Sequence, residues 1–111
     1  MDYQKLFNAI QADYDGWRDY AGLKKEKLDL QVFIGRKYAK ICRNHGQTAW
    51  GFVQLQDCNK FKKGDLLAAA SWRAPAKNMA RGNLINGDFS KVAWQGLMRV
   101  DLAISSTWRN K

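Results

Sequence analysis

Residues 61–86 read FKKGDLLAAASWRAPAKNMARGNLIN and join a basic turn, a short apolar run and a cationic segment. The apolar run Leu66–Ala70 predicts a short strand, and its small alanines predict that a helix or a backbone segment approaches closely. Pro75 is the only proline and directs the chain out of the strand into a loop. We expect one helical turn over 76–80, which Gly82 would end.

The loop after the strand is rich in positive charge. Trp72 stands beside Arg73, and an exposed tryptophan next to a cation is unusual unless it packs or binds. The pattern favours a surface that attracts anions, although a solvated face with Trp72 in the core remains an alternative. The basic residues in and around the loop are Lys60, Lys62, Lys63, Arg73, Lys77 and Arg81.

The composition is that of one folded, strongly basic domain. The 111 residues are 46% hydrophobic and 13% aromatic, which excludes a disordered tail, and the formal net charge is +9. Up to Asp29 the chain has five basic and six acidic residues, whereas from Leu30 onward it has 14 basic and four acidic ones. We therefore expect 1–29 to be structural and 30–111 to carry the working surface, with a polyanion as partner.

Apolar residues recur every three or four positions from Asp2 to about Ala21, which predicts an amphipathic helix with a break near Gly16 as an open alternative. We expect the stripe to pack on the domain's own sheet, although it could also bind another protein or a second copy. The stripe consists of Tyr3, Leu6, Phe7, Ile10, Tyr14, Trp17 and Ala21.

Two runs rich in β-branched and aromatic residues, 30–43 and 48–55, flank Asn44-His45-Gly46 and predict a hairpin. A three-residue loop ending in Gly46 would place Tyr38 opposite Phe52 and Lys40 opposite Trp50, with Arg36 on the same face. The other face would carry Ala39, Ile41, Ala49 and Val53.

An aromatic and basic sheet face is how several modules hold single strands, because rings stack on bases while cations neutralise phosphates. The alternative is that Trp50 and Phe52 pack under the N-terminal helix, since a one-residue change of register would exchange the faces. A last element over 97–104 is expected as a strand, although its spacing also fits a helix. The predicted fold class is α+β: an N-terminal amphipathic helix packed on a small, mostly antiparallel sheet of three to four strands, in a single domain.

Catalytic and metal-binding signals are weak. Cys42 and Cys58 are the only cysteines, and without a secretion signal we expect reduced core thiols. With His45, expected exposed in its turn, they are too few for a structural zinc site, and scattered acidic residues do not build a carboxylate pair. We therefore expect no enzyme, no metal and no cofactor. We also expect a cytoplasmic protein, because no stretch is long and apolar enough to span a membrane.

Three segments follow one another in a recognisable order: a KYxKI-like strand (Lys37–Ile41), an aromatic strand (Trp50–Val53) and GDLLAAASWRAPAKNMARGNLIN (Gly64–Asn86). They resemble a group of small, largely uncharacterised tailed-phage proteins that carry a block close to GDIxKAASWKAPAKxxARGNI. The resemblance covers about residues 36–86. It implies a phage origin, action in the bacterial host cytoplasm and a role in host takeover, and it transfers no catalytic residue.

The sequence thus favours a small, basic phage protein that binds nucleic acid with little sequence specificity. The alternative is a phage inhibitor or adaptor that docks on an acidic patch of a host nuclease, polymerase or defence component, with the same cations steering association. A homo-oligomer assembled through the helical stripe is a weaker third hypothesis. The residues expected to bind nucleic acid or a partner are Arg36, Lys40, Arg43, Trp50, Lys62, Lys63, Trp72, Arg73, Lys77 and Arg81.

Overall fold

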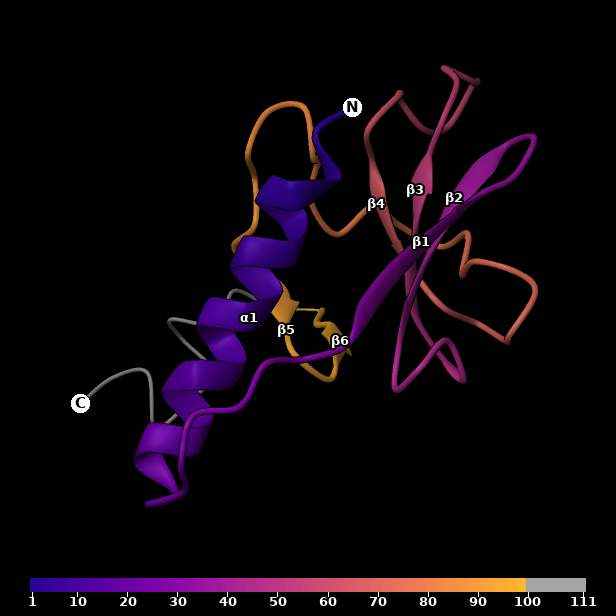
Figure 1. Cartoon of the computed structure of the whole chain (residues 1–111). Coiled ribbons are helices and arrows are strands. Elements are labelled where there is room, and N and C mark those ends of the chain that lie inside the picture. The colour runs from indigo at the N-terminus through magenta and orange to yellow at the C-terminus, as the bar shows by residue number, and fades with distance from the viewer. Residues whose placement is uncertain (100–111) are drawn as a thin grey trace.

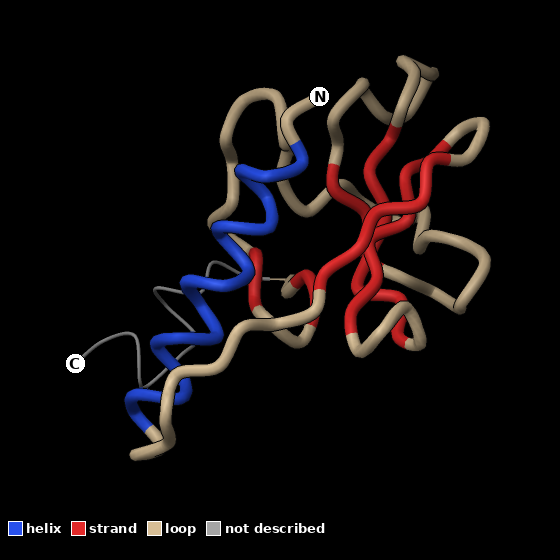
Figure 2. The backbone as a smooth tube through the Cα atoms, in the orientation of Figure 1, coloured by secondary structure: helices blue, strands red, loops and turns tan. Residues whose placement is uncertain are grey.

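The computed structural model describes residues 1–99 and confirms the α+β class (Figures 1 and 2). One helix packs beside a four-stranded antiparallel sheet, and two short strands form a second small sheet. No helix within the described residues combines the length and the apolar character that crossing a membrane requires. Beyond its first residues, the element expected at 97–104 lies outside the described residues. The elements are α1 (Tyr3–Tyr20), β1 (Leu30–Ile34), β2 (Tyr38–Arg43), β3 (Thr48–Gln54), β4 (Leu66–Ala68), β5 (Val92–Ala93) and β6 (Gly96–Leu97).

Helix α1 matches the predicted stripe. The carboxylate of Asp2 caps it by accepting from the backbone N–H of Gln4 at 3.1 Å, and the helix runs past Gly16 without a break. Leu6, Ile10 and Tyr14 are buried, so the stripe packs within the domain's own core.

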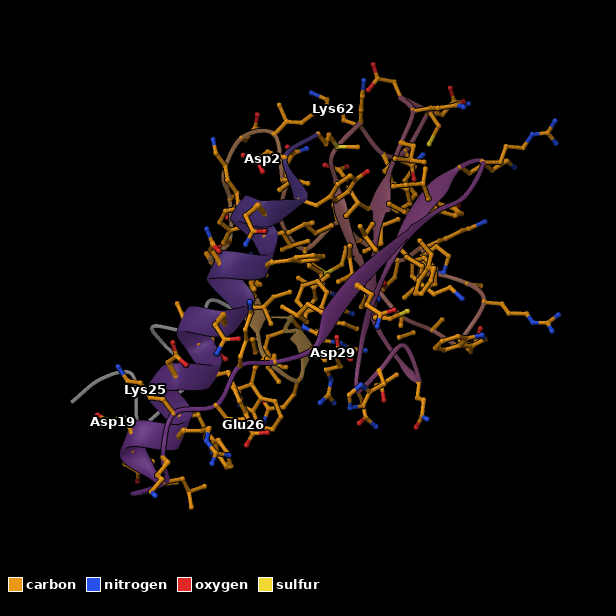
Figure 3. The ribbon with its side chains drawn as sticks, in the orientation of Figure 1. Asp2, Asp19, Lys25, Glu26, Asp29 and Lys62 are labelled. Atoms are coloured by element: carbon orange, nitrogen blue, oxygen red, sulfur yellow. The ribbon has the colours of Figure 1, made fainter. Side chains whose placement is uncertain are left out.

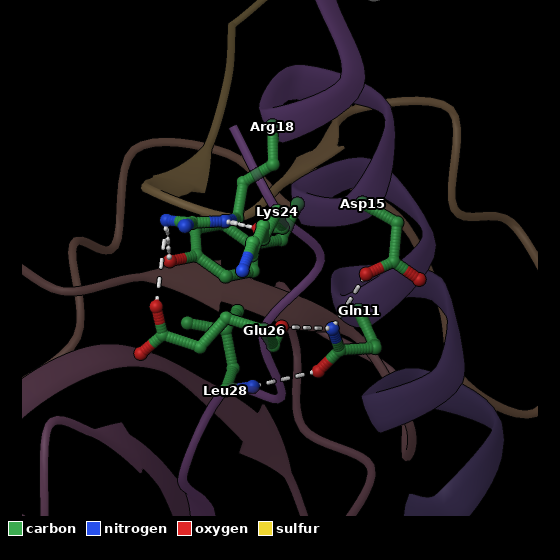
Figure 4. A network of polar contacts seen from close by, with 7 residues as sticks. Gln11, Asp15, Arg18, Lys24, Glu26 and Leu28 are labelled. Atoms are coloured by element: carbon green, nitrogen blue, oxygen red, sulfur yellow. Dashed lines mark hydrogen bonds and ion pairs between the residues drawn. The ribbon is translucent and has the colours of Figure 1, made fainter. Parts of the chain in front are cut away.

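The connector between α1 and β1 is tied back to the helix (Figure 4). The side-chain amide of Gln11 donates to the carbonyl of Glu26 at 2.9 Å and accepts from the N–H of Leu28 at 2.8 Å. Arg18 donates to the carbonyl of Lys24 and pairs with the Glu26 carboxylate at 3.5 Å. These bonds fix where β1 begins relative to α1.

The sheet order is β1-β2-β3-β4, with every neighbouring pair antiparallel. The run 30–43 was expected as one strand of a hairpin, and this was wrong, because Arg36 and Lys37 form a tight turn that divides it. The N–H of Gly35 donates to the carbonyl of Tyr38 at 2.9 Å and closes this turn. The cations of the turn therefore stand at the end of the sheet.

The predicted register of the second hairpin was shifted by two residues. Lys40 lies opposite Phe52, not Trp50, and a β-bulge follows at Ile41/Cys42. The turn over 44–47 has four residues, with Gly46 at the expected left-handed φ of +79°. Because a bulge inserts one unpaired residue, it turns Trp50 to the face opposite Phe52.

Two apolar clusters lie on opposite faces of the sheet. The larger joins Leu6 and Ile10 of α1 to Ile41, Trp50 and other residues of the sheet, so it fills the space between helix and sheet. The smaller consists of Phe52, Phe61 and Leu67, with Tyr38, Ala69 and Ala80 packed against it. In Figure 1 the loop after β4 passes the side of the sheet away from α1.

The segment after β4 folds back along that strand instead of forming the helical turn expected at 76–80. The N–H of Ala76 donates to the carbonyl of Ala68 at 2.7 Å, and the N–H of Arg81 donates to the carbonyl of Leu66 at 2.8 Å. This is the close backbone approach that the alanines predicted. The returning segment covers the edge of β4, and the loop tip, 71–74, lies over the face of the sheet that carries the smaller cluster.

Candidate nucleic-acid interface

A hollow of about 260 Å³ lies between the β1–β2 turn and the loop after β4. We call it the strand hollow. Its floor is the part of the sheet near Phe52, and cations from three separate segments stand around it. Its lining includes Phe33, Arg36, Lys37, Tyr38, Lys40 and Arg73.

Beside the strand hollow, the ammonium nitrogen of Lys40 lies 3.9 Å from the centre of the Trp72 ring. Trp72 is 45% exposed, so one part of the indole packs on the cation and the rest faces solvent. The hydroxyl of Ser71 accepts from the N–H groups of Arg73 and Ala74 at 3.3 and 3.2 Å, which orders the turn that presents the ring. An exposed aromatic ring is thus held next to positive charge, an arrangement worth about 0.5–1 kcal/mol at a surface.

A second cavity, of about 370 Å³, adjoins the strand hollow, because Lys37 and Tyr38 line both. We call it the lysine pocket. The ammonium group of Lys60 donates to the carbonyl of Lys77, which holds the two lysines together at its rim. The remaining lining is Gln54, Gln56, Asp57, Cys58 and Phe61.

Five of the predicted site residues therefore gather on one side of the sheet. Lys37 and Lys60 join them, although neither was assigned to the site. Lys37 follows Arg36 in the turn that divides 30–43, so recognising that turn in Gly35-Arg36-Lys37 would have found it. The gathered residues from the predicted set are Arg36, Lys40, Trp72, Arg73 and Lys77.

Arg43 belongs to a different part of the surface. Its guanidinium carbon lies 5.5 Å from the centre of the Trp94 ring, in a hollow next to α1 and the connector. Nearby, the imidazole of His45 lies 2.8 Å from the carboxylate of Asp29, and His45 is exposed as expected. Arg43 therefore does not extend the strand hollow.

Lys62 and Lys63 lie on the turn between β3 and β4 and line neither cavity. Figure 3 shows Lys62 at the top of the molecule, at the end where α1 begins. Their backbone N–H groups are held by acids: Lys62 donates to the Asp65 carboxylate at 2.9 Å and Lys63 to the Asp57 carboxylate at 2.8 Å. Their exposed side chains contribute positive charge outside the gathered site.

Trp50 was wrongly assigned to the binding surface. It is 2% exposed, and its indole N–H donates to the carbonyl of Ala93 at 2.8 Å. The β-bulge between β2 and β3 turns this ring into the core under α1. The alternative interpretation, in which both Trp50 and Phe52 pack under the helix, is therefore correct for Trp50 and wrong for Phe52, which lies in the smaller cluster. Trp50 therefore joins the sheet to β5 and has no surface for stacking.

Arg81 was also wrongly assigned. It is 8% exposed, and its guanidinium group donates to the carbonyl of Leu97 at 2.8 Å. Burial, and to a lesser degree the charge of Arg99, lowers the pKa of Arg81. The pairing of 80–83 with β4 directs this side chain toward β6, so Arg81 joins two parts of the fold.

The two cysteines also differ in their exposure to solvent. Cys42 is buried as expected, but Cys58 is exposed at the lysine pocket, because the loop 56–61 stays at the surface; both are free thiols. Within residues 1–99 no three His, Cys, Asp or Glu side chains group closely enough to hold a metal ion.

Comparison with other proteins places the chain in a family without assigning it a chemistry. No curated protein and no solved structure matched it. One family profile, described as a family of unknown function, DUF7717, matched residues 2–100. Since that match spans nearly all of the sequence, the chain belongs to the DUF7717 family.

Proposed function

We propose that this protein binds single-stranded nucleic acid with little sequence preference. The observation that carries the proposal is the exposed Trp72 ring held over Lys40 beside a hollow lined by Arg36 and Arg73. Cations of this kind neutralise phosphates, and an exposed ring stacks on any base, because every base has a π-face.

The shape of the site favours a single strand over a duplex. Proteins that read duplex DNA commonly place a helix or a two-stranded ribbon in the major groove. Among the described residues the only helix is α1, whose sequence carries three aspartates against one lysine and one arginine. The cations instead surround a recess, which admits unstacked bases and the backbone that joins them.

The direct test is fluorescence anisotropy with a labelled 15-nucleotide DNA at salt concentrations from 50 to 200 mM. If the strand contacts the six gathered cations, the slope of log affinity against log salt should be about −4, which is a loss of a few hundredfold over this range. The triple variant Arg36→Ala/Lys40→Ala/Arg73→Ala should bind more weakly and lower the magnitude of the slope by about two.

A matched control removes the same charge elsewhere. Lys5, Lys24 and Lys25 are exposed on or next to α1, so Lys5→Ala/Lys24→Ala/Lys25→Ala changes the net charge by the same amount. This control should bind nearly as the wild type does. Equal weakening in both triple variants would mean that only net charge acts, and binding that does not depend on salt would sink the proposal.

The resemblance to tailed-phage proteins supports placing this activity in an infected bacterial cell. A second candidate, docking on a host protein, is favoured by Phe33 and Ile34, which are exposed at the end of the edge strand β1. Retrieval of partners from a host lysate with and without nuclease treatment separates the two functions. A protein partner that survives nuclease and is lost in Phe33→Ser/Ile34→Ser favours docking, whereas a partner lost with nuclease favours nucleic acid.

A further inference from the structure

We propose that the lysine pocket receives one nucleobase that presents an N–H donor, while its lysines hold the attached phosphate. The inference rests on the proposed function and adds a subsite to it. A base turned out of a bound strand and a free mononucleotide present the same chemistry here. The residues that carry the argument are Lys37, Tyr38, Gln54, Lys60, Phe61 and Lys77.

Gln54 supplies the polar group that selects the ligand. It is 6% exposed, and its side-chain amide N–H donates to the carbonyl of Gln56 at 2.9 Å. Its amide oxygen is buried and has no hydrogen-bond partner among the described residues. The opposite amide orientation would set that oxygen against the Gln56 carbonyl, so the free group is an acceptor.

An acceptor left without a partner destabilises the folded chain, and a ligand that donates to it recovers that loss. The backbone at this position is fixed, because the N–H of Gln54 donates to the carbonyl of Asp65 at 2.9 Å and its carbonyl accepts from Gly64 at 2.8 Å. Because Gln54 lines the lysine pocket and its backbone is held, the side chain would rotate to present the buried oxygen to a donor there.

Two aromatic rings give the pocket flat apolar walls. Tyr38 packs edge-on against Phe52, with ring centres 6.0 Å apart, and this contact fixes the ring between the two cavities. Phe61 is buried under the ammonium group of Lys60, which lies 5.6 Å from its ring centre. Such walls suit a planar, weakly polar ring.

The charge around the pocket suits a phosphate. Three lysines line it against a single acid, Asp57, whose carboxylate accepts from the backbone of Lys63 at 2.8 Å. Ligand pockets commonly measure about 300–1,000 Å³, so the 370 Å³ here matches one nucleotide. Because Lys37 and Tyr38 also line the strand hollow, a strand lying there can extend one base into the pocket.

The exposed thiol of Cys58 reports on the pocket that it lines. The rate of Cys58 alkylation by iodoacetamide, followed by peptide mass spectrometry, should fall at least fivefold with saturating deoxycytidine monophosphate or with a ten-nucleotide oligodeoxycytidine. An abasic oligomer of equal length should leave the rate nearly unchanged, because it has the phosphates without the base. The N4,N4-dimethyl nucleotide, which lacks the N–H donors, should protect only weakly.

The variant Gln54→Met removes the acceptor and keeps the bulk of the side chain. It should weaken protection by the nucleotide about five- to tenfold. Thermal stability should change little, because the variant loses both the unpartnered acceptor and the hydrogen bond from the amide N–H to the Gln56 carbonyl, and these two losses oppose each other. The control Gln47→Met, exposed in the β2–β3 turn, should change neither property.

The outcomes separate the subsite from the strand-binding function. Equal protection by the abasic oligomer and oligodeoxycytidine, or unchanged protection in Gln54→Met, overturns the subsite even where salt-dependent strand binding persists. Absence of protection by both the nucleotide and the oligomer overturns it as well. Protection by the nucleotide alone, with no binding of the 15-nucleotide DNA, supports a site for free nucleotides and removes the strand-binding function.

Discussion

The Lys40 ammonium group lies under the Trp72 ring, with 3.9 Å between its nitrogen and the ring centre, and this contact joins strand β2 to the loop that follows β4. Positions 40 and 72 are far apart in the sequence, yet the pair brings a cation and an exposed aromatic ring to the same place. Trp72 is 45% exposed, so a large part of the residue contacts solvent and not the core.

Replacement of this ring should therefore affect affinity more than stability. Trp72→Ala should weaken binding of a 15-nucleotide DNA about 5- to 150-fold, since stacking on an aromatic residue contributes about 1–3 kcal/mol per base. Anisotropy titrations measure this loss, and urea unfolding should show a loss of no more than about 1 kcal/mol, which is the contribution of the contact with Lys40. Tyr20→Ala, at a similarly exposed aromatic on α1, is the control and should leave affinity unchanged.

Arg81 and Arg73 should respond in opposite ways. Arg81→Ala removes a buried guanidinium that donates to Leu97, and should lower the free energy of unfolding by about 1.5–3 kcal/mol. Arg73→Ala, at an exposed position, should change it by less than about 0.5 kcal/mol but should weaken DNA binding. Urea unfolding and anisotropy on both variants give the comparison. A large stability loss in Arg73→Ala instead would contradict the assignment.

The burial of the Cys42 thiol should make the stability of the fold depend on pH. Burial raises the pKa of the Cys42 thiol, and Lys40 opposes this shift in part. In the folded state the thiol therefore keeps its proton at a pH where the thiol of the unfolded chain has lost it. The contribution of Cys42 to the free energy of unfolding is complete below the ordinary thiol pKa. It is lost as pH rises through the raised folded pKa. Urea midpoints at pH 7 and pH 10 should fall more in the wild type than in Cys42→Ala.

The elements that the sequence predicted best are those decided by local periodicity. The spacing of Leu6, Ile10 and Tyr14 marked α1, and the left-handed Gly46 marked the turn between β2 and β3. The faces of the sheet were harder to predict. Trp50 and Phe52 have the same parity along the chain, and only the bulge at Ile41/Cys42, which has no local signature, sends them to opposite faces.

The site was predictable where its cations share one strand and turn, as Arg36 and Lys40 do. Arg73 and Arg81 look alike in the sequence, because both stand in a basic loop. Their difference depends on the backbone bonds between 76–83 and β4, which are tertiary contacts and leave no periodic signal. Local sequence therefore identified the cationic loop but not which of its arginines is buried.

At Gly82 the chain pairs with β4 and lies directly against the backbone of Asp88. Gly82 has a φ of +144°, and a Cβ added there would lie 2.4 Å from the carbonyl oxygen of Asp88. Gly82→Ala should therefore cost more than about 2 kcal/mol, from strain and from this clash together. Gly87→Ala is the matched control, because Gly87 also has a positive φ, +72°, but no heavy atom lies within 4 Å of its added Cβ; it should cost only about 1–2 kcal/mol. Urea unfolding of the two variants measures the difference, and an equal loss in both would show that the backbones at 82 and 88 do not meet.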